Sequence, residues 1–286
     1  MKFSELKSLY LIAEIGINHN GDMQIAKKLI DATHACSWHC VKFQKRNPDV
    51  CVPEDQKNVM RDTPWGRMTY LEYKYRMEFG KEEYDYIDKY CREKPISWTA
   101  SVWDMDSLGF LLNYDVPFIK IPSAHLTNKE MLEACGKSGK SIILSTGMST
   151  LDEIDSAVDL LRKLDVDFLL MHTNSSYPTP TNELNLNCIK TLRERYGCEI
   201  GYSGHEYGLE PTVFAAVLGA KVIERHITLD HEMWGTDQKA SIAPMGMDML
   251  YKRIRDVSAI LGDGLKRVTE SEISVIQRLR GNTIKK

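Results

Sequence analysis

The sequence predicts a single-domain (β/α)₈ barrel of the α/β class, also called a TIM barrel, and three observations support this. Strand-like and helix-like segments alternate roughly every 25 to 35 residues, as repeated βα units should. The length of 286 residues is normal for one such barrel. Residues able to take part in catalysis recur at the carboxyl ends of the strand-like segments, where barrel enzymes hold their active sites. A doubly wound open sheet is the main competitor, but no Gly-x-Gly-x-x-Gly turn follows the first strand.

Eight strands are expected, because short apolar runs are bounded by turn residues. We place them at 10–16, 40–44, 97–103, 118–123, 141–147, 167–174, 199–204 and 221–227. Helices should connect them at 23–35, 81–93, 104–113, a segment starting near 128, 151–163, 185–195, 209–218 and 246–262. In the first helix Ile25, Leu29 and Ile30 share one face, and Asp22 is placed to cap it. Either Ser149 or Thr150 should cap the helix at 151–163.

Two segments do not fit the repeat. Residues 46–80 carry prolines and many aromatic residues, and an interruption of this length inside a compact domain usually marks a lid or a functional insertion. The tail at 266–286 contains a stretch near 270–280 that is expected to form a short helix packed on the outside of the barrel. Its apolar residues are spaced for one helix face: Ile273, Ile276 and Leu279. No linker divides the chain, so residues 1–286 are expected to form one domain.

Composition and charge exclude several classes of partner. The net charge of -3 gives no electrostatic reason to expect binding to nucleic acid or to an anionic membrane. No apolar run approaches the length of a membrane span, and residues 1–10 are too short and too charged for a secretion signal. The seven cysteines are odd in number and scattered, which fits a reducing compartment. We therefore expect a soluble cytoplasmic protein.

Side chains capable of catalysis or of binding a metal or an anion recur at the ends of the expected strands. Two successive strands end in His205 and His226, and this pair suits a shared divalent metal with open coordination positions. Lys42 and Lys120 lie in apolar strands, where an unpaired ammonium would be costly, so with nearby hydroxyls they predict a cradle for phosphate or carboxylate. Glu14 ends an apolar strand and suits proton transfer, although it could instead form an ion pair with one of the lysines.

Further polar residues occupy the same strand ends. They are Gln44, Ser101, Ser123, Ser145, Ser175, Tyr177, Ser203 and Glu224. Each one alone has a plainer interpretation, since a serine at such a place is usually a turn residue and a histidine is often hydrogen-bonded in a core. His172 is mid-strand and is assigned to the core on this ground, whereas His19 either lines the mouth of the barrel or shapes its loop. The prediction of a site rests on their recurrence at one end of the barrel.

Seven short segments resemble one known family. They are Ala13-Glu-Ile-Gly-Ile-Asn-His19, Val41-Lys-Phe-Gln44, Ile119-Lys-Ile-Pro-Ser123, Ile143-Leu-Ser-Thr-Gly-Met148, Tyr177-Pro-Thr-Pro180, Gly201-Tyr-Ser-Gly-His205 and Ile223-Glu-Arg-His226. In consistent order over about residues 9–265, they are similar to the sialic acid synthase (N-acetylneuraminate synthase) family. That resemblance implies a TIM barrel that condenses phosphoenolpyruvate with an open-chain aldose. The products would be a 2-keto-3-deoxy sugar acid, as in sialic acid biosynthesis, and phosphate.

The resemblance also implies roles for individual residues. His205 and His226 would bind a divalent metal ion, manganese or magnesium, and Glu14 would be the acid/base residue. Phosphoenolpyruvate would be held by Lys42, Lys120, Ser101, Ser123, Ser145, Ser175 and Ser203. The sugar would be contacted by Gln44, Tyr177 and Asp237.

Three departures from the family pattern all fall on the sugar side. Members usually continue into a small C-terminal antifreeze-like domain, whereas this sequence ends at Lys286. The position two residues after Ser123, commonly acidic and in contact with sugar hydroxyls, is His125 here. Residues 46–80 also match poorly. We therefore expect the same reaction on a different acceptor, one that is smaller or not acetylated.

Other functions remain open at the level of sequence. One is a synthase of the 3-deoxy-octulosonate type that uses a phosphorylated or shorter aldose, and another is a metal-dependent aldolase that uses free pyruvate. A third, of a different class, is a non-catalytic sugar-binding barrel. A homodimer is the expected assembly, because barrel faces commonly pair.

Overall fold

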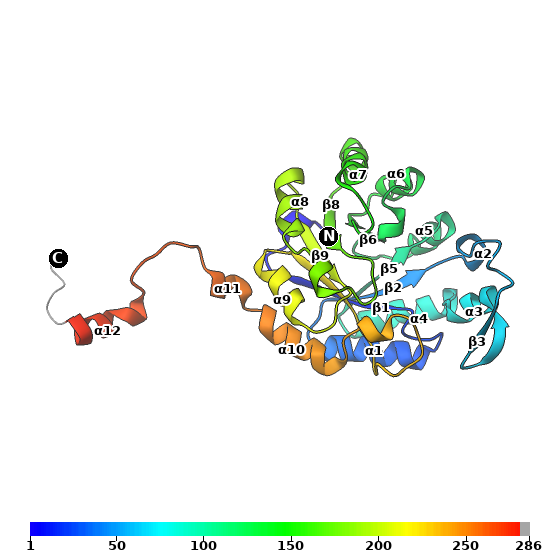
Figure 1. Ribbon diagram of the computed structural model, residues 1–286, viewed down its shortest axis with the longest axis horizontal. Coiled ribbons are helices and arrows are strands. Elements are labelled where there is room, and N and C mark those ends of the chain that lie inside the picture. The colour runs from blue at the N-terminus through cyan, green and yellow to red at the C-terminus, as the bar shows by residue number, and fades with distance from the viewer. Residues whose placement is uncertain (281–286) are drawn as a thin grey trace.

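A closed barrel of parallel strands forms the centre of the molecule in this computed structural model, which describes residues 1–280 (Figure 1). Around the barrel the strand order is β1-β10-β9-β8-β7-β6-β5-β2. The strands are β1 (Tyr10–Gly16), β2 (Cys40–Lys45), β5 (Ser97–Val102), β6 (Ile119–Ile121), β7 (Ile142–Ser145), β8 (Phe168–Thr173), β9 (Ile200–Gly204) and β10 (Val222–His226). The predicted fold class is therefore confirmed, and every expected strand is present with ends shifted by a few residues at most.

Helices cover the outside of this barrel (Figure 1). They are α1 (Met23–Ala35), α4 (Lys81–Glu93), α5 (Met105–Leu111), α6 (Lys129–Lys137), α7 (Leu151–Lys163), α8 (Cys188–Tyr196), α9 (Glu210–Val217) and α10 (Pro244–Ile254). Asp22 caps α1 by accepting a hydrogen bond from the Gln24 amide, as predicted. Of the two candidates for α7, Thr150 is the cap, and it forms a capping box with Glu153. No helix within residues 1–280 is long and apolar enough to cross a membrane.

Alternation along the strands divides the buried residues into two cores. Residues such as Leu11, Ala13 and Ile15 of β1 face the helices and join the large outer core. Ile12, between them, faces the barrel interior and packs in a smaller cluster that Phe3 closes from below. This inner cluster fills only the lower part of the barrel. Polar side chains occupy the upper part, which is where the functional site is expected.

The insertion at 46–80 has secondary structure of its own. It comprises α2 (Pro48–Cys51), the antiparallel hairpin of β3 (Met60–Thr63) and β4 (Gly66–Thr69), and α3 (Tyr70–Met77). Tyr73 and Met77 pack on Ile17 in the loop that follows β1. Gly21 in the same loop has a φ of +69°, and a Cβ atom there would lie 2.1 Å from the Arg76 carbonyl oxygen. The insertion is thus packed against the β1 end of the barrel, and its role as a lid stays a prediction.

The structure corrects two predictions near the C-terminus. The helix expected at 246–262 is two helices, α10 and α11 (Val257–Leu261), and Ile254 is the last fully buried side chain of the first. The tail helix exists as α12 (Glu270–Arg280), but it does not pack on the barrel and has no buried residue (Figure 1). The spacing of apolar residues in a sequence predicts an apolar helix face but does not identify what packs against that face. Residues 281–286 of the predicted tail lie outside the described part.

A buried ion pair joins the ends of β9 and β10. Arg225, whose side chain is fully buried, bonds Glu206 at 3.0 Å and Thr212 at 2.8 Å. Its guanidinium also donates to the carbonyl oxygens of Glu206 and Gly208. Since Arg225 lies between two inward-facing residues of β10, it faces outward. It fixes the loop that follows β9 from the helix side of the barrel.

We predict that Arg225→Met lowers the free energy of unfolding by about 3–5 kcal/mol, because it leaves the Glu206 carboxylate buried without its cation. Urea denaturation of the two proteins would measure the difference. Arg195→Met is the matched control: Arg195 pairs with Asp155 on the surface, where solvent screens the pair and its removal should cost far less. Equal losses in both variants would contradict the assignment of Arg225 as a buried structural anchor.

Candidate active site

The inward-facing rows of three adjacent strands change from apolar to charged toward their carboxyl ends. In β2 the row runs from Cys40, in the inner apolar cluster, to Lys42. In β1 the same change leads from Ile12 to Glu14, and β10 ends its row with His226. The register sets Glu14 opposite Lys42 on one side and opposite His226 on the other. Strand pairing alone therefore brings a carboxylate, an ammonium group and an imidazole together.

These rows surround a cavity of about 220 Å³ at the carboxyl end of the barrel. All but two of the residues predicted for the site line it: Glu14, Lys42, Gln44, Ser101, Lys120, Ser123, Ser145, Ser175, Tyr177, Ser203, His205 and His226. The two that do not line it are His125 and Asp237. The predicted set thus converges in space, while its functional roles remain to be tested.

Two lysines and two glutamates form the floor of this cavity. Lys42 Nζ lies 2.6 Å from a Glu14 carboxylate oxygen and 3.6 Å from one of Glu224. Lys120 Nζ lies 3.9 Å from the same Glu224 oxygen. All four side chains are at most 4 % exposed. Of the two interpretations open for Glu14, the structure shows the ion pair with a lysine, which does not exclude a part in proton transfer.

The four charges act strongly on one another because water is excluded. Burial opposes the charged form of Lys42, but Glu14 and Glu224 outweigh it and raise the Lys42 pKa. Burial likewise opposes an ionised Glu224, yet Lys120 and Lys42 together hold its pKa below the usual range. For Lys120 burial dominates and lowers the pKa to about 8, although Glu224 acts in the opposite direction. Of the two lysines, Lys120 is therefore the one that loses its charge closer to neutral pH.

Hydroxyl groups surround the two ammonium groups. Lys42 Nζ donates to Ser101 Oγ at 2.8 Å, and Lys120 Nζ donates to Ser145 Oγ at 2.7 Å. A second group of hydroxyls meets at Gly147. Its amide donates to Ser123 Oγ at 3.0 Å, and a Cβ atom at this position would lie 2.3 Å from Ser175 Oγ. Only glycine, which has no side chain, leaves this space open. The backbone amide and the hydroxyl groups around it therefore converge in the way that binding of an oxyanion requires.

The His205 ring is oriented by its contacts. Its Nδ1 lies 2.6 Å from the Asn174 carbonyl oxygen, which can only accept, so Nδ1 carries the proton. The Nε2 lone pair is then free for another group, and in this structure it accepts from the Tyr177 hydroxyl at 2.8 Å. Burial and the nearby His226 ring lower the pKa of His205 to about 3. A neutral imidazole held by a backbone carbonyl is the usual state of a metal ligand.

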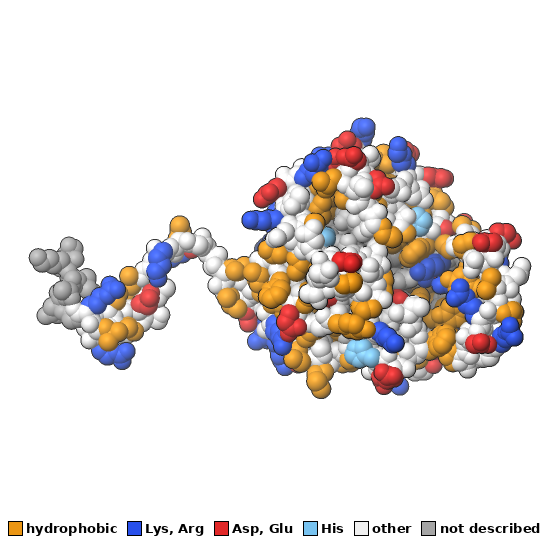
Figure 2. All heavy atoms as spheres, in the orientation of Figure 1, with side chains coloured by type: hydrophobic (Ala, Val, Ile, Leu, Met, Phe, Trp, Pro, Cys, Tyr) orange, Lys and Arg blue, Asp and Glu red, His pale blue; other side chains and the backbone are white. Residues whose placement is uncertain are grey.

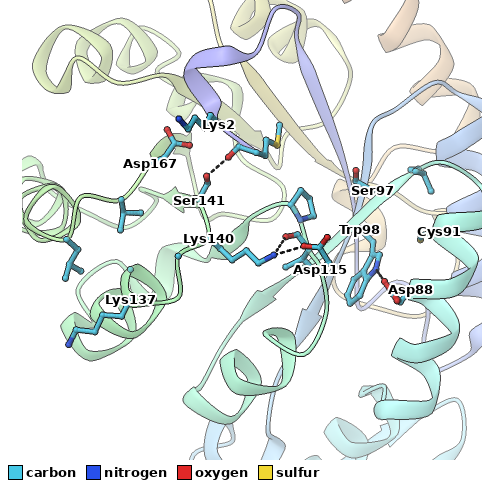
Figure 3. A pocket seen from close by; sticks show the side chains of 18 of the residues that line it. Lys2, Asp88, Cys91, Ser97, Trp98, Asp115, Lys137, Lys140, Ser141 and Asp167 are labelled. Carbon is cyan, nitrogen blue, oxygen red and sulfur yellow. Dashed lines mark hydrogen bonds and ion pairs between the residues drawn. The ribbon is translucent and has the colours of Figure 1, made fainter.

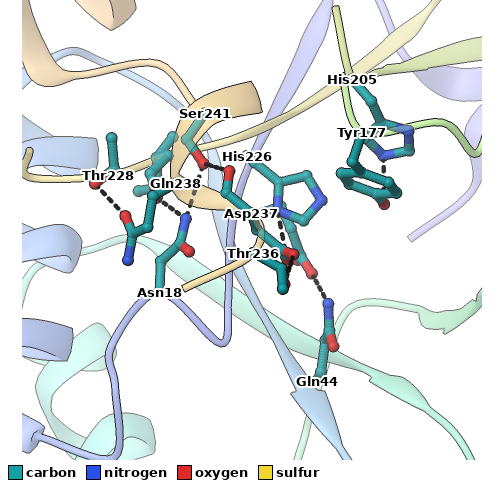
Figure 4. Close-up of polar contacts among 12 residues, drawn as sticks. Asn18, Gln44, Tyr177, His205, His226, Thr228, Thr236, Asp237, Gln238 and Ser241 are labelled. Atoms are coloured by element: carbon teal, nitrogen blue, oxygen red, sulfur yellow. Dashed lines mark hydrogen bonds and ion pairs between the residues drawn. The ribbon is translucent and has the colours of Figure 1, made fainter. Parts of the chain in front are cut away.

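The His226 ring lies beside that of His205, with ring centroids 5.3 Å apart (Figure 4). Its Nδ1 is buried without a hydrogen-bond partner and lies 3.6 Å from a carboxylate oxygen of Asp237. Asp237 is therefore the carboxylate next to His226 Nδ1, at a distance too long for a hydrogen bond in this structure. Within residues 1–280 no group of three or more His, Cys, Asp and Glu side chains is arranged to hold a metal ion. The donors fit a two-histidine site, with one ring oriented and the other unpaired.

Asp237 owes its position to the loop that follows β10. Asn18, in the loop after β1, donates to the Ile227 carbonyl oxygen and to Ser241 Oγ, both at 2.8 Å (Figure 4). Gln238 is fully buried and bonds Thr228. These bonds hold the loop against β1. Sequence reasoning did not identify Asn18, although a buried asparagine after a strand end was a usable signal.

His125 lies outside the central cavity. Its ring meets the edge of Trp103, with centroids 5.8 Å apart, and it lines a neighbouring cavity of about 490 Å³. Trp103 and Ala124 line both cavities, so they separate the two spaces. Trp103 was not among the predicted site residues. Glu224 was noted at a strand end without a role, but it is the carboxylate that both lysines share.

A larger hollow, with a volume of about 990 Å³, lies elsewhere in the described chain (Figure 3). It lies around the amino ends of the strands, where Ser141 and Asp167 bond the N-terminal segment. Lys140 there is paired with Asp115 at 2.8 Å. Its charges are of both signs, and none of the predicted catalytic residues lines it. The smaller cavity at the opposite end is therefore the candidate active site.

Comparison with known proteins finds similar sequences over most of the chain. A sequence profile of the NeuB family matches residues 29–266. The N,N'-diacetyllegionaminic acid synthase of Campylobacter jejuni is 34% identical, over 98% of this chain and 86% of that protein. The N-acetylneuraminate-9-phosphate synthase of Drosophila melanogaster is 36% identical, over 96% and 73%. The human enzyme of the same name is 34% identical, over 97% and 78%.

Solved structures show the same fold. The N-acetylneuraminic acid synthetase of Leptospira borgpetersenii, in complex with citrate, gives a TM-score of 0.86 at 31% identity and covers 98% of this chain and 94% of that one. A truncated 3-deoxy-D-arabino-heptulosonate 7-phosphate synthase of Thermotoga maritima gives 0.66 at 14% identity, over 88% and 87%. The second likeness is one of fold only.

Because the pKa of Lys120 is about 8, a small dianion should bind the cavity more weakly as pH rises through this value. Proton loss removes a positive charge that anion binding favours. Sulfate is a suitable probe, since its own charge does not change there. Calorimetric titration should show the Kd rising by up to about tenfold per pH unit above pH 8. Lys120→Met should bind weakly at every pH, and a constant Kd in the unchanged protein would refute the assignment.

Proposed function

The chain belongs to the NeuB family, and from this premise we propose that it condenses phosphoenolpyruvate with the open-chain form of an aldose. The products would be a 2-keto-3-deoxy sugar acid of the nonulosonic type and phosphate. The observation that carries the proposal is the buried pair of lysines with its hydroxyls, placed next to two histidines in one cavity. The relatives support the same reaction class, since they are named as synthases of legionaminic acid and of N-acetylneuraminate 9-phosphate.

Phosphoenolpyruvate would occupy the floor of the cavity. Lys42 and Lys120 offset its phosphate and carboxylate charges, and the hydroxyls already bonded to them would turn toward its oxygens. The amide and hydroxyls that converge at Gly147 offer further donors without a side chain in the way. A buried cradle of this kind holds the enol ester still and excludes bulk water from it.

The sugar would lie above, toward Gln44 and Tyr177, with its aldehyde near the two histidines. A divalent ion, manganese or magnesium, held by His205 Nε2 and by His226, would polarise the aldehyde oxygen. Tyr177 would then give up its bond to His205 and be free to contact the sugar. Asp237 would orient His226 in this arrangement. It need not touch the sugar itself.

Carbon three of phosphoenolpyruvate attacks the aldehyde carbon, and positive charge develops at carbon two. Water adds at carbon two, and the tetrahedral ester loses phosphate by carbon–oxygen cleavage to leave the ketone. Glu14 accepts the proton of the attacking water and returns it to the new alkoxide. Lys42 Nζ lies 2.6 Å from one carboxylate oxygen of Glu14, and Gln44 fixes the other oxygen with a hydrogen bond of 3.0 Å. Both contacts prepare Glu14 to act as a base.

The direct test is phosphate release from phosphoenolpyruvate, with manganese present and a panel of aldoses that differ in length, acylation and phosphorylation. Release that depends on the aldose, with a 2-keto acid formed in equal amount, is the expected result. Binding of neither phosphoenolpyruvate nor manganese in calorimetry would instead favour a non-catalytic barrel. Release of phosphate is not expected of an aldolase that uses free pyruvate, so the same assay separates that alternative.

Glu14→Gln should lower kcat by about 10²- to 10⁴-fold, because the amide cannot accept the water proton. The KM for phosphoenolpyruvate should change much less, since the lysines and hydroxyls of the floor remain. Steady-state kinetics with one productive aldose would measure both constants. A loss confined to KM would show that Glu14 only organises the floor.

Activity should disappear with a chelator and return with manganese or magnesium. His205→Ala should be inactive at every metal concentration, and its manganese affinity, measured by electron paramagnetic resonance, should fall. His34→Ala is the control, since His34 is exposed on α1 and remote from the strand ends. Full turnover after metal removal would overturn the role given to the two histidines.

A further inference from the structure

His19 is a buried histidine in the loop that joins β1 to α1. The residue is 3 % exposed, beneath a barrel surface whose visible face carries charged side chains of both signs (Figure 2). His19 is not among the residues that line the active-site cavity. Of the two roles that the sequence left open, the structure thus favours the one in which His19 shapes its loop. This loop follows Gly16, which is two residues beyond Glu14 in the sequence.

Both nitrogens of the His19 ring take part in hydrogen bonds with the backbone of this loop. Burial lowers the pKa of His19 to about 3, so the ring is neutral at neutral pH. Its Nδ1 accepts from the Gly21 amide at 3.0 Å, which places the proton on Nε2. A hydrogen bond with the Gly16 backbone opposes the lowering of the pKa, as donation to a carbonyl oxygen does. The ring therefore ties Gly16 to Gly21.

Two aromatic rings fix the orientation of the His19 ring. Phe79, at the end of the insertion, stacks on it with centroids 4.0 Å apart and an angle of 22° between the planes. Phe43 of β2 is tilted against it at 6.1 Å. Both phenylalanines belong to the large outer core. The His19 ring cannot turn without disturbing this packing, so its hydrogen bonds are held in one geometry.

Gly16 lies directly against the carboxylate of Glu14. The pairing of β1 with β2 is irregular between these two residues, as in a β-bulge, and Gly16 has a φ of +54°. A Cβ atom at Gly16 would lie 3.1 Å from Glu14 Oε1 and 3.1 Å from Gln44 Nε2, two atoms that are bonded to each other at 3.0 Å. Bulges next to active sites re-aim side chains. The Gly16 backbone thus forms the wall on which this carboxylate oxygen rests.

We propose that His19 is a positioning residue for Glu14: by fixing the Gly16 backbone, it holds the Glu14 carboxylate where it takes up a proton during the reaction. The inference rests on the proposed function, in which Glu14 is the base. His19 does not contact the substrates and acts through Gly16. Because Phe79 stacks on His19, the packing of the insertion at 46–80 supports the placement of the base.

A general contribution of His19 to stability is the alternative to exclude, and His39 provides the matched control. The Nδ1 atom of His39 accepts from the Leu11 amide at 3.0 Å, and its ring stacks on Tyr10 with centroids 5.0 Å apart. His39 therefore makes the same kinds of contact with the same strand. They lie at the amino end of β1, whereas His19 acts at the carboxyl end, next to Glu14.

His19→Phe keeps the aromatic stacking and removes both hydrogen bonds. Its kcat should fall by about 10- to 100-fold, because a displacement of about 1 Å at a reacting group can cost about 10²-fold in rate. The KM for phosphoenolpyruvate and the manganese affinity should not change, since the lysines and the two metal-site histidines remain. His39→Phe should keep the kcat of the unchanged protein. An unchanged kcat in His19→Phe, or equal losses in both variants, would overturn the proposal.

Two amide variants make the test independent of how well His19→Phe folds. His19→Gln can still accept and donate within the loop and should retain more of the kcat than His19→Phe. His19→Asn, whose shorter amide cannot bridge Gly16 and Gly21, should lose as much as His19→Phe. A kcat in His19→Asn equal to that of the unchanged protein would also contradict the role of the ring.

A double-substitution cycle shows whether His19 acts through Glu14. In Glu14→Gln the residue to be positioned is already inactive as a base, so adding His19→Phe should lower kcat no further. Losses that multiply would show that His19 acts elsewhere and would overturn the proposal.

Crystal structures of the unchanged protein and of His19→Phe test the same role without turnover. In the variant Gly16 should leave its left-handed conformation, and the hydrogen bond between Glu14 and Gln44 should be lost. A Glu14 carboxylate that does not move would refute the role of His19. If the unchanged protein releases no phosphate with any aldose, the proposed function fails, and this comparison still decides whether His19 holds Glu14.

Discussion

The balance of two ammonium groups against two carboxylates in a space without water is the interaction on which the active-site cavity depends. Lys42 and Lys120 could not be buried alone, and neither could Glu14 or Glu224. Their ammonium nitrogens and carboxylate oxygens lie 2.6 to 3.9 Å apart. Each charge therefore lowers the free-energy cost of burying the opposite ones. The arrangement holds the lysines ready for an anion on the floor of the cavity, above the apolar cluster in the lower part of the barrel.

Strand register, more than any single contact, places these groups. Glu14 has Lys42 as its partner on β2 and His226 as its partner on β10, while Ser203 pairs with Glu224 and Ser101 with Lys120. A shift of one residue in any of these pairings would turn a charged row toward the helices. On the other side of β10, Arg225 secures the loop that carries His205. The strand ends that carry the two histidines are therefore fixed from the helix side of the barrel as well as from its interior.

Sequence reasoning predicted much of this and failed at definable points. Local signals are sufficient for the barrel, for the cap Asp22 and for the polar rows, because period and turn chemistry decide which face a residue takes. They left Ser149 and Thr150 as alternative caps, of which the structure shows Thr150. They do not decide which acid a lysine pairs with, so Glu14 was left between two interpretations and Glu224 had no role. The same limit explains His125, which follows the strand end but turns toward Trp103. The apolar face of α12 was predicted to pack on the outside of the barrel, but spacing alone does not identify what such a face contacts, and no residue of α12 is buried.

Charge balance also constrains what enters the site. The floor is close to neutral before substrates arrive, since its two lysines are already matched by two glutamates. A multiply charged enol phosphate would bring excess negative charge into a space of low dielectric constant. A divalent ion on the histidines would offset part of that charge, which is a physical reason for a metal independent of its role with the aldehyde.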